Sequence, residues 1–166
     1  MSSKNTTKSS IINYELKVAS IQGLEGVTIG GLAKDLKISK SGLFRHFGFK
    51  EVLQLEILKA SEKLFFDKVI YPALCAKTGL IKLKLFFDNW LNLIQSDDDQ
   101  SGCFFTALGL ELDEKPGSAR NFLVSSYRKT FIILLQVIKE VKLEKGLLKS
   151  IDSRIFINEI WGIIIT

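Results

Sequence analysis

The sequence predicts an all-α protein. Its 166 residues include only two prolines, and Leu, Ile, Phe and Lys are frequent. Apolar residues recur every three or four positions through most of the chain, which is the period of an amphipathic helix, and strand-like alternation is rare. Because 46% of the residues are hydrophobic, a chain of this length can bury a sizeable core in one or two small domains.

Residues 28 to 50 predict two short helices separated by a tight turn. Thr28 can cap the first helix, whose apolar residues recur once per turn. Ser39 offers a cap oxygen for the second helix, in which Leu43 and Phe47 form an apolar side. This is the layout of a helix-turn-helix, whose second helix enters the major groove of DNA. The other side of the second helix carries small and basic residues, namely Lys40, Ser41, Gly42 and Arg45.

The positive charge of the chain is concentrated in its first third. The whole chain has 23 Lys and Arg against 18 Asp and Glu, a net charge of +5. Residues 1 to 50 hold eight of these basic and three of these acidic side chains, so residues 51 to 166 hold 15 of each. The excess therefore coincides with the predicted helix-turn-helix, as expected of a module that binds a polyanion.

Other helices are expected on both sides of this motif. One runs from about residue 9 to 21, after a polar, frayed stretch at residues 1 to 8. A long helix opens near Lys50 and keeps an apolar stripe until Pro72 stops it. Four further helices are expected at residues 80 to 96, at 103 to 112, at 118 to 144, and from Asp152 onward.

We expect a cytoplasmic protein that is not bound to a membrane. No apolar run follows the polar N-terminus, so a secretory signal is not predicted. The longest apolar run has about five residues, FIILL at 131 to 135, and is far too short to span a bilayer. The two cysteines, Cys75 and Cys103, are expected to be reduced and buried.

Residues 9 to 60 resemble the TetR family of bacterial transcription regulators. The stretch GLEGVTIGGLAKDLKISKSGLFRHFGFKEVL at 23 to 53 matches the family's glycine, hydrophobic and LF-x-HF positions, and residues 102 to 120 are similar to one subgroup. The resemblance implies a DNA-binding domain at residues 9–50, then a connecting fourth helix and a helical ligand-binding and dimerisation domain at residues 51–166. It also implies a homodimer that binds a palindromic operator, in most cases as a repressor, and is released by a small-molecule effector.

The resemblance further implies which residues contact DNA. Lys40, Ser41 and Arg45 fall where the family reads base edges, and the fork of Arg45 suits two acceptors on one guanine. Gly42 lets the backbone of the reading helix approach the DNA closely. Contacts with phosphates, which set the register without reading sequence, are implied for Thr28, His46 and Lys50. Thr28 would cap its helix in any case, and a packing role for His46 is the alternative.

Three departures from the family pattern affect these expectations. Phe44 stands where many relatives have a tyrosine, so a hydroxyl that bonds phosphate is missing. Phe49 replaces the usual small polar cap of the fourth helix, at a cost of about 1 kcal/mol. Relatives typically continue for one helix beyond the one that starts near Asp152, and their last two helices form the dimer interface. We therefore expect the 51–166 domain to be incomplete at its C-terminus and the dimer to be weaker than in relatives.

Aromatic side chains in the second part of the chain predict an effector pocket. Ligand sites are mostly apolar cavities, although an aromatic stripe at helical spacing also suits an ordinary core. No charged residue is expected to be buried among these side chains, so an apolar or aromatic effector is favoured. The candidate residues are Phe86, Trp90, Phe104, Phe105 and Tyr127.

An enzyme is not expected. Nucleophilic catalysis by Cys103 or a serine would need a nearby base, and His46, the only histidine, lies in the DNA-reading segment. The sequence contains no metal-binding cluster, P-loop or GxGxxG motif, so no cofactor is expected. The remaining alternative is a truncated or decayed regulator that acts only as an interaction protein.

Overall fold

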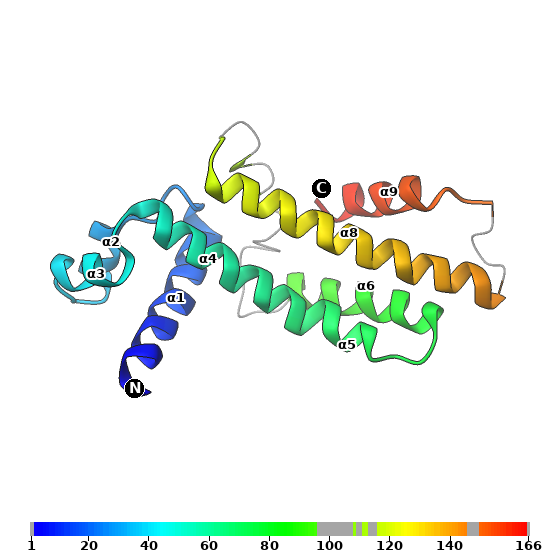
Figure 1. Cartoon of the computed structure of the whole chain (residues 1–166), viewed down its shortest axis with the longest axis horizontal. Helices are drawn as coiled ribbons and strands as arrows, with labels where there is room; N and C mark the ends of the chain where they lie inside the picture. The colour runs from blue at the N-terminus through cyan, green and yellow to red at the C-terminus, as the bar shows by residue number, and fades with distance from the viewer. Residues whose placement is uncertain (1, 96–107, 109–110, 113–115, 146–149, 166) are drawn as a thin grey trace.

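The computed structural model describes residues 2–95, 108, 111–112, 116–145 and 150–165 (Figure 1). The elements within these residues are helices, so the predicted all-α class is confirmed. We call α1 to α3 the head and the elements from η1 onward the body. The head lies at one end of the molecule, and α4 runs from it into the body (Figure 1).

The head consists of α1 (Ser2–Gln22), α2 (Ile29–Asp35) and α3 (Lys40–Phe47). α1 begins at residue 2, so the expectation of a frayed stretch up to residue 8 is wrong. Both predicted caps are present: Thr28 Oγ1 accepts from the Gly31 amide at 3.0 Å, and Ser39 Oγ accepts from the Gly42 amide at 3.1 Å. These bonds satisfy amides that a short helix would otherwise leave unpaired.

The long connecting helix continues past the predicted stop. α4 (Lys50–Phe65) passes into a π-helical segment, η1 (Phe66–Ile70), and then into α5 (Tyr71–Leu74). Pro72 lies in the first turn of α5, where a missing amide hydrogen does no harm. The prediction that Pro72 ends the helix is therefore wrong, because the widened π turn lets a new α-helical turn begin around the proline. As predicted, Phe49 provides no side-chain cap for α4.

The body is built on α6 (Gly79–Gln95), α8 (Ser118–Lys145) and α9 (Ser153–Ile165). α8 packs against α4 and α6 and carries α9 along its length (Figure 1). α6 and α8 approach so closely that a Cβ on Gly79 would lie 2.7 Å from the backbone nitrogen of Val141. Two carboxylates of α8 hold the start of α6: Glu144 Oε1 accepts from the Gly79 amide at 2.7 Å, and Glu140 pairs with Lys82 at 2.8 Å.

A single hydrophobic core extends from the head into the body. Among the described residues, no helix is long and apolar enough to cross a membrane. Cys75 is exposed, so the expectation that it is buried is wrong: it follows the last turn of α5, at the surface. Cys103 lies outside the described residues.

Candidate DNA interface and effector site

The predicted base-reading residues lie together on the outer side of α3. Lys40, Ser41 and Arg45 are exposed, whereas Leu43 and Phe47 on the inner side are buried in the head. Gly42 is half-buried, and its amide is the one that Ser39 caps. α3 therefore presents two positive charges and one hydroxyl to solvent on a helix of eight residues.

Of the three residues predicted to contact phosphates, two are exposed to solvent and one is paired within the protein. Thr28 and His46 are exposed, so a buried packing role for His46 does not hold. Lys50 is half-buried and paired within the protein: its Nζ donates to the Glu25 carbonyl at 3.0 Å and lies 2.9 Å from Glu25 Oε2. A phosphate contact by Lys50 would compete with this pair, and it stays a prediction.

An aromatic pair that sequence reasoning did not assign to DNA lies beside the basic residues. Phe44 is 53% exposed on α3, and Phe49 is 68% exposed just before α4. Their rings meet edge to face with centroids 6.1 Å apart. Since Phe44 follows Lys40 by one helical turn and adjoins Arg45, an apolar surface lies next to the two cations.

The head also buries a carboxyl group. Glu15 on α1 is 2% exposed. Burial and the negative charge of Asp35 raise the pKa of Glu15 from 4.5 to about 7. A carboxyl group is expected to be exposed, although Glu15 lies about one helical turn from the buried Ile12 and Ala19.

Three of the predicted effector residues gather around one aromatic cluster in the body. Trp90 is fully buried and packs edge to face on Phe86 at 5.6 Å and on Trp161 of α9 at 5.2 Å. Tyr127 on α8 lies 5.5 Å from Trp161. Phe104 and Phe105 lie outside the described residues. Sequence reasoning missed Trp161 as a partner because it could not tell which side of α9 faces α6.

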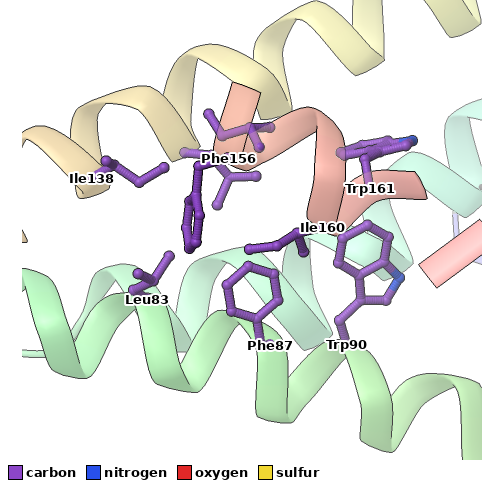
Figure 2. Close-up of a pocket in the computed structure, with 9 residues that line it drawn as sticks. Leu83, Phe87, Trp90, Ile138, Phe156, Ile160 and Trp161 are labelled. Atoms are coloured by element: carbon purple, nitrogen blue, oxygen red, sulfur yellow. The ribbon is translucent and has the colours of Figure 1, made fainter. Parts of the chain in front are cut away.

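This cluster leaves almost no free space. The cavity beside it has a volume of about 10 Å³, roughly enough for one water molecule. Figure 2 shows its side chains converging from α6, α8 and α9. One polar atom in the cluster is unsatisfied: the Trp90 Nε1–H is buried and has no hydrogen-bond partner within the described residues. A buried donor in this state costs about 1–3 kcal/mol. The lining residues are Leu83, Phe87, Trp90, Leu134, Ile138, Phe156, Ile157, Ile160 and Trp161.

A larger groove of about 460 Å³ lies between α4, η1 and α8. Its floor includes Phe66 of η1 and Ile133 of α8. Its polar side holds Ser126, whose Oγ donates to Glu62 Oε1 at 2.6 Å, and Lys129, which pairs with the same carboxylate at 3.1 Å. The π-helical segment contributes Phe66, Asp67 and Ile70 to the lining, and no sequence pattern indicated that segment. Among the described residues, no group of His, Cys, Asp and Glu is placed to hold a metal ion.

A capped helix-turn-helix joined by a long helix to a helical bundle is the architecture of a DNA-binding transcriptional regulator. The sequence profile described as "Tetracyclin repressor-like, C-terminal domain" matches residues 79–166, just over half of the chain. The chain therefore belongs to the TetR family of transcriptional regulators. Proteins of this family are regulators and not enzymes. No curated protein matches the chain.

Several solved structures of TetR-type regulators share the fold. AibR in complex with isovaleryl coenzyme A and operator DNA has a TM-score of 0.77 and 18% identity, over 94% of this chain and 82% of AibR. The ketosteroid transcriptional regulator KstR2 of Mycobacterium tuberculosis has a TM-score of 0.73 and 14% identity, over 99% and 81%. The fatty acid degradation regulator FadR of Bacillus halodurans has a TM-score of 0.71 and 17% identity, over 95% and 83%.

Proposed function

We propose that this protein is a repressor that binds a palindromic operator as a homodimer. The observation that carries the proposal is the outer side of α3, where exposed Lys40, Ser41 and Arg45 stand on a helix held by the Ser39 cap. An Arg fork reads guanine, and Lys and Ser serve bases or nearby phosphates. The domain division follows: residues 9–50 bind DNA, and residues 51–166 bind effector and dimerise. Operators lie in the bacterial cytoplasm, so the protein would act there.

An exposed apolar surface on α8 and α9 supports the homodimer. Ile132 is 64% exposed and Ile155 is 58% exposed. A groove of about 380 Å³ is lined by Ile132 together with Tyr127, Phe131 and Trp161, and also by the polar Arg128 and Asn158. Exposed apolar surface of this kind commonly marks an interface, and a two-fold axis lets one surface serve both copies. A dimer can then hold two α3 helices about one turn of duplex apart.

The effector we propose has an apolar body and at least one hydrogen-bond acceptor. The cavity at Trp90 is lined by apolar side chains. An acceptor such as a carbonyl oxygen would satisfy the Trp90 Nε1–H, which has no partner in the part of the chain that the structure describes. The cavity must widen to admit a ligand. AibR bound to isovaleryl coenzyme A and the ketosteroid regulator KstR2 support an acyl or steroid-like ligand.

Binding of the full chain to DNA selected from a random pool tests the proposal. Arg45→Ala should weaken operator binding by about 1–3 kcal/mol and relax preference at one base pair. Lys139→Ala removes an exposed charge on α8 and serves as the control that should leave affinity unchanged. If no sequence is enriched, or if Arg45→Ala binds as well as the unchanged protein, the DNA-reading role is wrong. An interaction protein without DNA affinity would then be the better description.

Lys50 needs its own measurement because it is paired with Glu25. If Lys50 leaves Glu25 for a phosphate, Lys50→Ala should reduce the salt dependence of binding by about one unit of slope. An unchanged slope would mean that Lys50 stays with Glu25 in the complex.

Sedimentation at increasing concentration tests the homodimer, and Ile132→Glu should shift the equilibrium toward the monomer. Isovaleryl coenzyme A, titrated into the complex, tests the effector class by release of DNA.

A further inference from the structure

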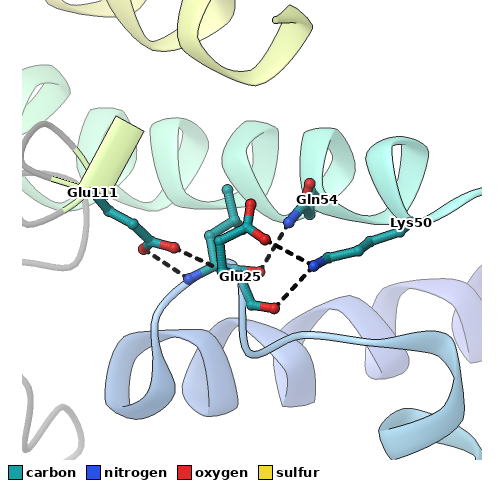
Figure 3. A network of polar contacts seen from close by, with 5 residues as sticks. Glu25, Lys50, Gln54 and Glu111 are labelled. Carbon is teal, nitrogen blue, oxygen red and sulfur yellow. Dashed lines mark hydrogen bonds and ion pairs between the residues drawn. The ribbon is translucent and has the colours of Figure 1, made fainter. Parts of the chain in front are cut away.

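Glu111 connects the body to the head through two backbone amides. Its Oε2 accepts from the Leu24 amide at 2.8 Å, and its Oε1 accepts from the Glu25 amide at 2.7 Å. These residues are more than 85 positions apart in sequence. Both carboxylate oxygens are thus committed to the turn between α1 and α2 (Figure 3). Bonds between a carboxylate and backbone amides are among the stronger hydrogen bonds in proteins.

The turn is shaped to receive this carboxylate. Gly23 has a φ of +76°, a conformation that residues with a side chain rarely adopt. A Cβ at Gly23 would lie 3.1 Å from Glu111 Oε2, closer than an ordinary contact. Glycine therefore provides both the backbone conformation and the space for Glu111.

The same turn is held from its other side by α4. Gln54 Nε2 donates to the Leu24 carbonyl at 3.0 Å, and Lys50 binds the Glu25 carbonyl and carboxylate (Figure 3). Leu24 itself is fully buried, so losing the Glu111 bond would leave a shielded amide unpaired. The turn is therefore bonded to α4 on one side and to Glu111 of the body on the other.

Glu111 is in turn anchored in the body. Its neighbours Leu108 and Leu112 are 0% and 3% exposed and belong to the hydrophobic core. α4 joins the head to the body covalently and packs against α1. The Glu111 contact is a further attachment of the head, made by a residue outside α4, and so restricts how the head can turn on the body.

We propose that Glu111 is a positioning residue: its carboxylate sets the orientation of the head on the body and so the placement of α3 on DNA. The proposal rests on the proposed function, because it assigns Glu111 a role in operator binding. In a dimer, each α3 must meet its half-site at a defined spacing, so rotational freedom of the heads weakens binding. A displacement of Glu111 relative to the rest of the body would be passed to the head through the same two bonds.

Amide hydrogen exchange and operator affinity, measured on the full chain, test this role together. Glu111→Gln keeps the size of the side chain but leaves only one acceptor for two amides. The Leu24 and Glu25 amides should then exchange at least tenfold faster, and operator affinity should fall at least fivefold. Glu111→Asp keeps the charge but retracts it by one methylene, and both effects should be intermediate.

Glu144→Gln is the matched control, because Glu144 accepts from the Gly79 amide within the body at 2.7 Å. It should speed exchange at Gly79 and leave Leu24, Glu25 and operator affinity unchanged. Unaltered exchange at Leu24 and Glu25 in both Glu111 variants would refute the contact. Faster exchange with undiminished operator affinity would refute the positioning role. Absence of DNA binding by the unchanged protein would refute the proposed function and the role in operator binding, whereas the exchange data would still decide the contact.

Discussion

The indole of Trp90 meets the indole of Trp161 edge to face, with ring centroids 5.2 Å apart. These are the two tryptophans of the chain, one fully buried on α6 and the other half-buried on α9. Intrinsic fluorescence of the protein therefore reports on the contact between α6 and α9. Since the candidate effector cavity is lined by both rings, the same signal should respond to a ligand that enters there.

Trp90→Ala should lower the free energy of unfolding by about 3–5 kcal/mol, because it removes a fully buried ring. Trp90→Phe should cost clearly less, since it keeps an aromatic ring in the cluster. Urea unfolding followed by circular dichroism measures both variants. Equal losses for the two substitutions would mean that a phenyl ring at this position contributes nothing to stability.

The stability of the head should depend on pH through Glu15. Its pKa is raised to about 7 in the folded protein by burial and by Asp35, against 4.5 when unperturbed. The folded state therefore binds this proton more tightly than the unfolded chain, and stability falls as pH rises from about 4.5 to about 7. The penalty is absent below this range and complete above it.

Glu15→Gln should thus stabilise the protein at pH 8 and have little effect near pH 4. Asp35→Asn should shift the transition to lower pH, because it removes a neighbouring negative charge. Glu51→Gln, at an exposed position, is the control. Urea unfolding at several pH values gives the comparison. A stability difference for Glu15→Gln that does not change with pH would show that folding does not raise the pKa of Glu15.

Phe44 should contact a thymine methyl group in the operator. The ring is 53% exposed on α3 beside Arg45, and a phenylalanine contacts this methyl in the major groove. Replacing each operator thymine in turn by deoxyuridine removes one methyl, worth about 0.8 kcal/mol or roughly a fourfold loss of affinity. The loss should occur at one position with the unchanged protein and with Phe44→Tyr, and disappear with Phe44→Ala. If Phe44→Ala lost as much affinity as the unchanged protein when the same thymine is replaced by deoxyuridine, the contact between Phe44 and the methyl group would be contradicted.

Two glycines in the body should respond to alanine with opposite signs. At Gly79 a Cβ would lie 2.7 Å from the backbone of α8, so Gly79→Ala should destabilise the protein by about 1–3 kcal/mol. At Gly162, within α9, a Cβ would meet no atom of the described residues within 4 Å, so Gly162→Ala should stabilise by about 0.5–1 kcal/mol. Thermal unfolding measures both. A neutral Gly79→Ala would mean that α6 and α8 separate readily.

Features that depend on neighbours in sequence were predicted well. The Thr28 and Ser39 caps, and the division of α3 into a buried and an exposed basic side, follow from residues three or four positions apart. The prediction that Pro72 ends the long helix was wrong, although it also rests on a local rule. That rule assumes a regular α-helix before the proline, and here a π-helical segment precedes it. Trp90, a candidate effector residue, is fully buried, but its partner Trp161 was not foreseen.

The sequence by itself determined the helices, the basic surface of α3 and the family resemblance, because periodicity, caps and charge act over one or two turns of chain. Only the tertiary structure decided that Lys50 pairs with Glu25, that Glu15 is buried and that Glu111 holds the turn at Leu24. Lys50 and Glu25 are 25 positions apart in the sequence, and Glu111 and Leu24 are 87 positions apart. No local pattern encodes them, since they form only when the core brings the head, α4 and the body together.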